Sequence, residues 1–294
     1  MIRYLQLLPL LFLLACGSAG KKEVPKPVIT VSILPQKTFV EKIAGDDFQV
    51  NVLVPPGASP ATYSLLPAQM TAIARSAVWF RIGHIGFEYA WADKVVQTNP
   101  EMKVYDLSQG LDLIAASRGT GEPAQGIDPH VWLSPANVKK MARQIRDVLT
   151  ALQPEHSDKY QLGYLQFIKE IDQTNVEIRN ILKEVQGRKM ISFHPSFSYF
   201  ARDYGLEQLS IESGGKEPTP AQLARLVNTA RTEQIRVVYI QSEFDLEHAR
   251  VFAREIGGEI VQLSPLSPDW ADNLLQIARV IRDNCLADKN FKQP

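Results

Sequence analysis

Short runs of apolar and β-branched residues alternate with segments of helical period through most of the chain. The helical segments place apolar residues three or four positions apart, as Leu223, Leu226 and Ala230 show. Strands separated by helices of this length predict parallel sheets with right-handed crossovers. The predicted fold class is therefore α/β, with parallel sheets flanked by helices. Eight runs are predicted to be strands: Val28–Ile33, Gln49–Val54, Val78–Ile82, Lys103–Tyr105, Lys189–Phe193, Glu207–Ile211, Arg236–Ile240 and Glu259–Leu263.

One segment in the middle of the chain breaks this alternation. Residues 154–186 contain Gly163 as their only Gly and no Pro after Pro154. Their apolar side chains recur at spacings that form one stripe of a helix of roughly 30 residues, about 45 Å long. We therefore expect an N-terminal α/β lobe (residues 28–150) and a C-terminal α/β lobe (residues 188–294), joined by one long connecting helix (residues 154–186).

The first sixteen residues read MIRYLQLLPLLFLLAC, with one Arg before a short apolar run. Such a run is typical of a signal peptide, because a helix that spans a bilayer needs roughly 20 apolar residues. A small residue followed by Cys16 resembles the cleavage site of bacterial lipoproteins. We expect residues 1–16 to be a lipoprotein signal peptide, Cys16 to carry the lipid, and residues 17–27 to be a tether. The alternative is a plain secretory signal in which Cys16 has no role.

This amino terminus predicts a location in the cell envelope, on the periplasmic or extracytoplasmic side, with a lipid anchor in the membrane. It leaves open whether the anchor lies in an inner or an outer membrane.

The composition of the chain excludes some classes of function. The chain has 32 Lys and Arg against 32 Asp and Glu, so it lacks the basic excess expected of a nucleic-acid-binding protein. Two cysteines among 294 residues exclude a disulfide framework and a cysteine-rich zinc module.

Candidate metal ligands lie at strand ends and in loops. His84, His194 and Glu243 each follow a predicted strand, and His130 lies in a loop before a predicted helix. Ligands bind open parallel sheets at the carboxyl ends of the strands, and imidazole with carboxylate suits a divalent transition metal, above all zinc. His130 and His194 each adjoin a Pro and an aromatic residue. The alternatives are that His84 only forms hydrogen bonds and that Glu243 is a carboxylate near a helix start.

Longer motifs extend over nearly all of the chain after the signal peptide. They are PPGASPATY (55–63), residues 83–91, DPHVWLSP (128–135), HPSFSYFARDYGL (194–206) and GKEP (215–218). Together they resemble the solute-binding proteins of bacterial zinc and manganese ABC importers, the cluster A-I or zinc-uptake binding-protein family. The resemblance implies a metal ion held between two lobes and delivered to a membrane permease. It also implies that the long helix limits hinge motion.

The family resemblance implies four metal ligands, either three histidines and a carboxylate or two of each. His130 and His194 match two of them. Ala61 and Ser264 stand where the other two are expected, and residues 115–126 lack the His-rich loop of many zinc-specific members. We expect His84 and Glu243 to replace the missing ligands and to complete a tetrahedral site of three nitrogens and one oxygen. The alternative is a degenerate site.

These observations predict a binding protein that performs no chemistry. It captures a divalent transition metal, zinc first and manganese as the alternative, and passes it to an ABC permease. We expect it to be a monomer. One alternative is a family member that binds another solute or a metal chelate. Another is a lipid-anchored metallohydrolase with an open coordination position, although the chain contains no His-Glu-x-x-His, Gly-x-Ser-x-Gly or P-loop motif.

Overall fold

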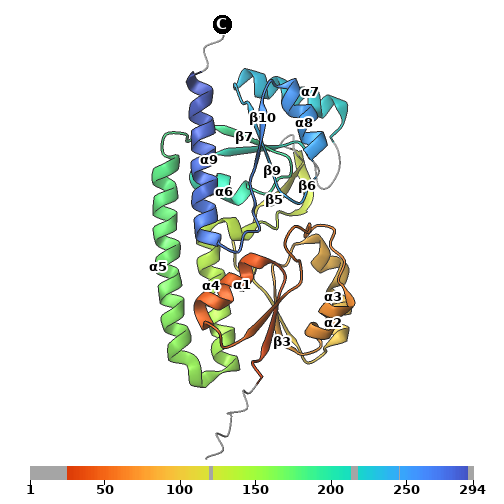
Figure 1. The fold of residues 1–294 in the computed structure, drawn as a ribbon, viewed down its shortest axis with the longest axis vertical. Coiled ribbons are helices and arrows are strands. Elements are labelled where there is room, and N and C mark those ends of the chain that lie inside the picture. The colour runs from red at the N-terminus through yellow and green to blue at the C-terminus, as the bar shows by residue number, and fades with distance from the viewer. Residues whose placement is uncertain (1–24, 119–121, 213–217, 245, 291–294) are drawn as a thin grey trace, which may run out of the picture.

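The structure is a computed structural model that describes residues 25–118, 122–212, 218–244 and 246–290. The predicted signal peptide, Cys16 and residues 17–24 of the predicted tether lie outside the described residues. Two four-stranded parallel sheets follow one another along the long axis of the molecule, with long helices beside them (Figure 1). The predicted α/β fold class, with parallel sheets flanked by helices, is confirmed.

The first sheet is built from the amino-terminal strands in the order β2-β1-β3-β4. All four residues of the inner strand β1 are buried, as expected for a parallel strand covered on both faces. This explains why its sequence is a nearly continuous apolar run. The elements are β1 (Val28–Val31), α1 (Leu34–Ala44), β2 (Gln49–Val52), α2 (Pro67–Ile73), β3 (Ser76–Arg81), α3 (Gly86–Thr98) and β4 (Lys103–Asp106).

The second sheet is built from the carboxyl-terminal strands in the order β10-β9-β7-β8. Its inner strand β9 is also buried at all four positions. The eight predicted strands form within two residues of their predicted bounds. The elements are β7 (Lys189–Ser192), α6 (Ser198–Tyr204), β8 (Glu207–Ser210), α7 (Pro220–Thr232), β9 (Val237–Ile240), α8 (Leu246–Glu255) and β10 (Glu259–Gln262).

The long helix between the sheets is shorter than predicted. Helix α5 covers Ser157–Leu182, and Pro154–His156 forms a separate 3-10 turn before it. At 1.5 Å per residue its 26 residues extend about 39 Å. Two further long helices, α4 (Pro135–Leu152) and α9 (Trp270–Asn290), pack against it.

Helix α9 follows the second sheet in sequence and runs beside that sheet and α5, and its first residue reaches the first half of the molecule (Figure 1). Trp270 at its start packs edge-on against Phe39 of α1 and Phe167 of α5, with ring centroids 5.8 and 6.3 Å apart. The two sheets are therefore connected by more than the single helix predicted from the sequence. The boundaries predicted for the two lobes stay a prediction.

An antiparallel hairpin was not predicted. It consists of β5 (Ala115–Arg118) and β6 (Glu122–Ile127). The segment contains Gly and Pro and lacks the alternation of apolar and polar residues that indicates a strand. The backbone N–H of Asp128 donates to the carbonyl of Ile114 at 2.9 Å, so the base of the hairpin fixes where the DPH motif begins.

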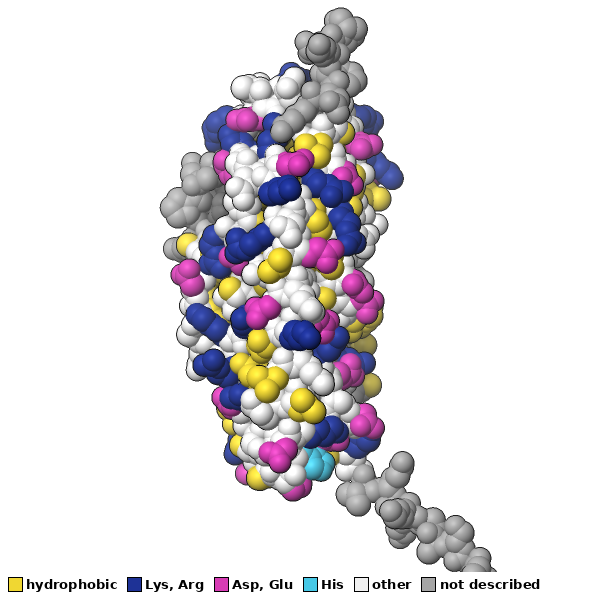
Figure 2. Space-filling model, turned by 90° about the vertical axis from the view of Figure 1, so that its left-hand side faces the viewer, with side chains coloured by type: hydrophobic (Ala, Val, Ile, Leu, Met, Phe, Trp, Pro, Cys, Tyr) yellow, Lys and Arg dark blue, Asp and Glu magenta, His cyan; other side chains and the backbone are white. Residues whose placement is uncertain are grey.

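The outer face of the long helices is solvated and of mixed charge. Figure 2 shows Lys and Arg interspersed with Asp and Glu along this face, with hydrophobic side chains between them. Leu162, Leu165 and Val176 of α5 are exposed. Within the described ranges, none of the helices has the length and apolar character needed to cross a membrane.

Candidate metal centre

A cavity of about 690 Å³ lies where the carboxyl ends of strands from both sheets face each other. All four predicted ligands, His84, His130, His194 and Glu243, line it. Ligands of parallel sheets were expected at the carboxyl ends of the strands, and the four residues indeed lie around one cavity there. They lie on two different walls.

His130 is held by the residue two positions before it in the DPH motif. The carboxylate of Asp128 accepts hydrogen bonds from the backbone N–H of His130 at 2.9 Å and from its Nδ1 at 2.7 Å. Asp128 is itself anchored, because its carbonyl accepts a bond from the hydroxyl of Tyr199 at 2.9 Å. The ring of Trp132 packs against His130 with centroids 5.2 Å apart. The imidazole therefore has a fixed position and orientation.

His194 is held in the same way by a carboxylate from the neighbouring strand. It follows β7, and its Nδ1 lies 3.0 Å from Oε2 of Glu212, which follows β8. The backbone N–H of Glu212 donates to the carbonyl of Phe193 at 2.8 Å, so the parallel pairing of β7 with β8 sets this contact. The ring of Phe244 stacks on His194 with centroids 5.0 Å apart.

The two imidazoles face each other across a short gap. Their ring centroids lie 5.2 Å apart at an interplanar angle of 71°. Because a carboxylate occupies Nδ1 of each ring, Nε2 is the nitrogen left for a ligand. Histidines that bind metals almost always donate their other ring N–H to a carboxylate, a carbonyl or water. The pair therefore has the arrangement of two metal ligands.

The protonation state of His130 also suits metal binding. Burial lowers the pKa of its imidazole below the ordinary value, and this outweighs the opposing effect of the Asp128 carboxylate. A neutral ring presents a lone pair at Nε2 near pH 7, so a metal ion has no proton to displace there.

His84 lies on the opposite wall of the cavity. Its Nδ1 lies 2.9 Å from the hydroxyl of Tyr89. The loop that carries it lies against the Ala61 loop, because the backbone N–H of Phe87 donates to the carbonyl of Pro60 at 3.2 Å. A Cβ at Gly86 would lie 2.5 Å from the carbonyl oxygen of Ala61, so this approach requires a glycine.

A buried carboxylate fixes the start of the His84 loop. Glu88, which is 0% exposed, accepts bonds from the backbone N–H groups of Ile82 at 2.7 Å and of Gly83 at 2.6 Å. It also accepts a bond from the hydroxyl of Ser32. Burial raises the pKa of Glu88, and these hydrogen bonds oppose the rise without cancelling it. The loop is thus held from inside the first sheet, while the imidazole at its tip bonds, within the part of the chain that the structure describes, to Tyr89 alone.

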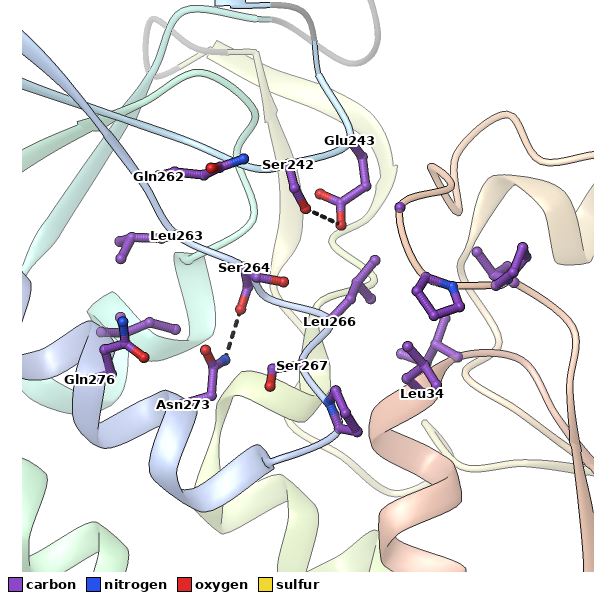
Figure 3. A pocket seen from close by; sticks show the side chains of 17 residues that line it. Leu34, Ser242, Glu243, Gln262, Leu263, Ser264, Leu266, Ser267, Asn273 and Gln276 are labelled. Carbon is purple, nitrogen blue, oxygen red and sulfur yellow. Dashed lines mark hydrogen bonds between the residues drawn. The ribbon is translucent and has the colours of Figure 1, made fainter.

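Glu243 lies at the border with a second cavity, of about 470 Å³. Figure 3 shows its carboxylate bonded to the hydroxyl of Ser242, with Ser264 nearby and bonded to Asn273. Because β9 and β10 are adjacent in the sheet, Glu243 and Ser264 line this second cavity together.

The four predicted ligands do not converge on one point. Among the described residues, no three His, Cys, Asp or Glu side chains form a group that could hold a metal ion. The structure brings His130 and His194 together, and it leaves His84 and Glu243 at other positions around the cavity. The tetrahedral set of three nitrogens and one oxygen is not assembled, because His84 belongs to the opposite wall and Glu243 bonds to Ser242.

Sequence reasoning did not identify the residues that orient the two imidazoles. Asp128 was noted as part of a motif but given no role, and Glu212 was not considered. The signal for Glu212 was present, since it directly follows the predicted strand Glu207–Ile211, as His194 follows Lys189–Phe193. Finding the contact required the strand order, which places β8 next to β7.

Comparison with known proteins identifies the family of the chain. Residues 29–284 match the family described as zinc-uptake complex component A, periplasmic. A putative metal-binding protein of Chlamydia muridarum is 31% identical over 266 residues, which cover 89% of this chain and 93% of that protein. The manganese-binding lipoprotein MntA of Halalkalibacterium halodurans is 26% identical over 249 residues, covering 83% of this chain and 80% of that protein. A crystal structure of a ZnuA deletion mutant with zinc bound is 38% identical, with a TM-score of 0.84 and coverage of 92% of this chain and 100% of that one.

The fold, the cavity and the paired imidazoles define a metal-binding solute-binding protein of an ABC importer. The chain belongs to the family of zinc-uptake complex component A, periplasmic. The resemblance noted in the sequence motifs is thereby confirmed.

Proposed function

We propose that this protein captures a zinc ion at His130 and His194 and delivers it to the permease of an ABC importer, without chemical change. The observation that carries the proposal is the pair of imidazoles, that of His130 buried and that of His194 partly buried, each held at Nδ1 by a buried carboxylate. Two nitrogen ligands favour zinc over manganese, which suits a shell richer in oxygen. Manganese is the second candidate, since the relative MntA is named as a manganese-binding lipoprotein.

The geometry supports capture that begins on one wall. His130 and His194 both lie on loops that enclose the same side of the cavity, and no lobe movement is needed to bring their rings to 5.2 Å. A lipid on Cys16 would hold the protein beside the membrane that contains its permease, with residues 17–27 as the tether. Release then requires only that the permease competes for an ion held by two protein ligands.

The role of His84 and Glu243 as further ligands stays a proposal. Both line the cavity with the two histidines, so each would reach the metal only if the walls approach one another on binding. Zinc titrations of His84→Ala and Glu243→Ala test this role. A loss of affinity of about tenfold, equivalent to about 1.4 kcal/mol, would support direct coordination in that variant. Unchanged affinity in both variants would exclude it.

The proposed cargo is tested by titrating the metal-free mature protein with zinc, in the presence and absence of excess manganese. We expect one zinc ion per chain and little displacement by manganese. The double variant His130→Ala/His194→Ala is the control and should bind no zinc at this stoichiometry. Equal binding by the wild type and the double variant would contradict the proposed site. Displacement of zinc by manganese would show that manganese, and not zinc, is the preferred cargo.

A further inference from the structure

Tyr199 is a buried tyrosine near the candidate metal centre to which the proposed coordination gives no role. It lies in the first turn of α6, five positions after His194, and is 0% exposed. Its hydroxyl accepts a hydrogen bond from the backbone N–H of Ile114 at 3.0 Å and donates one to the carbonyl of Asp128 at 2.9 Å. The segment that carries one proposed ligand is thus bonded to the chain just before the other, His130.

The direction of both hydrogen bonds follows from the chemistry of the partners. A backbone N–H can only donate, and a backbone carbonyl can only accept. The single proton of the Tyr199 hydroxyl must therefore point to Asp128, which leaves an oxygen lone pair for the N–H of Ile114. Burial raises the pKa of Tyr199 to about 12, so the hydroxyl keeps this proton near pH 7.

These two bonds alter the base of the β5–β6 hairpin. The pair at the base is Ala115 with Ile127, and Ile114 and Asp128 come next. Residues of a hydrogen-bonded antiparallel pair exchange two N–H···O bonds. One is present, since the N–H of Asp128 donates to the carbonyl of Ile114 at 2.9 Å. In place of the other, the Tyr199 hydroxyl stands between the two groups. The hairpin is therefore held open on one side where the DPH motif begins.

The position of Asp128 decides where the imidazole of His130 lies. The carboxylate of Asp128 accepts hydrogen bonds from both the backbone N–H and Nδ1 of His130. A displacement of Asp128 therefore displaces the imidazole, whose ring centroid lies 5.2 Å from that of His194. Because Tyr199 and His194 belong to one segment, the hydroxyl sets the position of one imidazole relative to the other.

Tyr199 is itself held in place by a neighbour on its helix. The guanidinium carbon of Arg202 lies over the ring of Tyr199, 5.1 Å from its centroid. Nη1 of Arg202 also donates to the carbonyl of Asp112 at 3.0 Å, two positions before Ile114. Helix α6 is thus joined to the start of the hairpin by a second contact, which supports the position of the hydroxyl.

We propose that Tyr199 is a positioning residue of the metal site, whose hydroxyl between Ile114 and Asp128 fixes the imidazole of His130 opposite that of His194 before the metal binds. This inference rests on the proposed function. Tyr199 acts through Asp128 and does not coordinate the ion. Its effect is preorganisation, because two nitrogens that are already grouped need less ordering when zinc binds.

Two variants on one helix isolate the role of the hydroxyl. Tyr199→Phe removes the hydroxyl and keeps the ring. The N–H of Ile114 and the carbonyl of Asp128 must then pair directly or lose their partner, and either change shifts the DPH motif. The matched control is Tyr204→Phe, because Tyr204 is also buried on α6 and its hydroxyl donates to Oδ1 of Asn175 at 3.0 Å. Circular dichroism and the melting temperature of both metal-free variants establish that they are folded.

The first measurement is zinc affinity by isothermal titration. We expect Tyr199→Phe to lose about tenfold in affinity, at the lower end of the range seen when a partner outside the metal's own ligands is removed. The lower end applies because the hydroxyl acts on Asp128 and not on an imidazole. Tyr204→Phe should bind zinc as the wild type does.

The second measurement separates positioning from a general loosening of the fold. The Nδ1 protons of His130 and His194, each bonded to a carboxylate, are followed by NMR of the metal-free protein labelled with 15N-histidine. In Tyr199→Phe we expect the His130 signal to shift or to be lost by exchange with water, while the His194 signal stays. Tyr204→Phe should leave both signals unchanged.

A third measurement needs no variant. Amide hydrogen exchange of the metal-free wild type should show a protected N–H at Ile114, because this group donates to the hydroxyl of Tyr199. An Ile114 amide that exchanges as fast as an unprotected one would overturn the inference even if Tyr199→Phe does not fold.

The inference is also overturned if Tyr199→Phe binds zinc as the wild type does. The same holds if the two histidine signals change together or if neither changes, because a loss of affinity would then not arise from the position of His130. A wild-type protein that binds no zinc would instead remove the proposed function and this inference with it.

Discussion

The two walls of the cavity differ in how firmly their histidines are held. On one wall, His130 and His194 each bond at Nδ1 to a buried carboxylate, and their rings lie edge to face. On the other wall, the hydrogen-bond partner of His84 among the described residues is the hydroxyl of Tyr89, which is 63% exposed. The side chain of Ala61, on the same wall, has no atom that can bind a metal. Preorganised ligands bind more tightly because less ordering is needed on binding. We therefore expect metal capture to depend mainly on the wall that carries His130 and His194.

The largest loss of zinc affinity is expected when a ligand is removed from the wall that carries His130 and His194. Removing a residue that only orients a metal ligand typically lowers affinity by up to roughly 100-fold. His194→Ala should lower zinc affinity by more than this, because it removes one of the two grouped ligands themselves. Isothermal titration of the metal-free protein measures this effect.

The matched control is His156→Ala, which removes an imidazole that bonds to Asp47 and Tyr160 away from the cavity. It should leave affinity unchanged. Similar losses in the two histidine variants would show that zinc binds without regard to the cavity.

A smaller effect is expected from the carboxylate that holds His194. Glu212→Gln keeps the size of the side chain and removes the charge that orients the imidazole, and it should weaken zinc binding between about 10- and 100-fold. The control is Glu207→Gln, an exposed carboxylate on the preceding strand β8. No difference between Glu212→Gln and Glu207→Gln in the same titration would mean that His194 needs no carboxylate.

The weaker wall can be strengthened in turn. Ala61→His places an imidazole beside the His84 loop, and we expect zinc affinity to rise about tenfold, equivalent to about 1.4 kcal/mol. Thr62→His is the control, because Thr62 lines the same cavity at the next position. An equal gain in both variants would indicate non-specific attraction of zinc to the cavity, and no gain in Ala61→His would show that the two walls do not share a metal.

The smallest effect concerns the buried carboxylate under the His84 loop. Burial raises the pKa of Glu88 above its unfolded value, so the unfolded chain loses this proton at a lower pH than the folded protein does. The contribution of the protonated form to stability is full below the unfolded pKa and is lost as pH rises through the folded pKa. The free energy of unfolding of the wild type, compared with Glu88→Gln, should therefore fall as pH rises above about 4.3. Urea unfolding at a series of pH values measures this difference, and a constant difference would contradict the raised pKa.

The sequence predicted the sheets well because buried parallel strands are continuous apolar runs. It predicted too long a connecting helix, since nothing in the apolar stripe marks the 3-10 turn at Pro154–His156. It did not predict the β5–β6 hairpin, whose residues carry no strand pattern. It also did not predict the packing of the start of α9 against α1 and α5, which depends on long-range contacts of Trp270.

The sequence predicted those site residues that stand in a recognisable local pattern, and it missed those that depend on long-range contacts. His194 follows a predicted strand, His130 lies in a loop before a predicted helix, and each adjoins a Pro, which drew attention to them. Their carboxylate partners depend on the register of β7 with β8 and on the turn of the DPH motif. The grouping of His84 and Glu243 with the two histidines could not be judged from adjacency of loops, because adjacent loops can face different walls.

X-ray absorption at the zinc K-edge of the stoichiometric zinc complex of the mature protein tests the central claim most directly. The account predicts two imidazole nitrogens from the protein at about 2.0–2.1 Å, with one of them lost in His130→Ala and one in His194→Ala. A zinc shell without imidazole, or one that neither substitution alters, would contradict it.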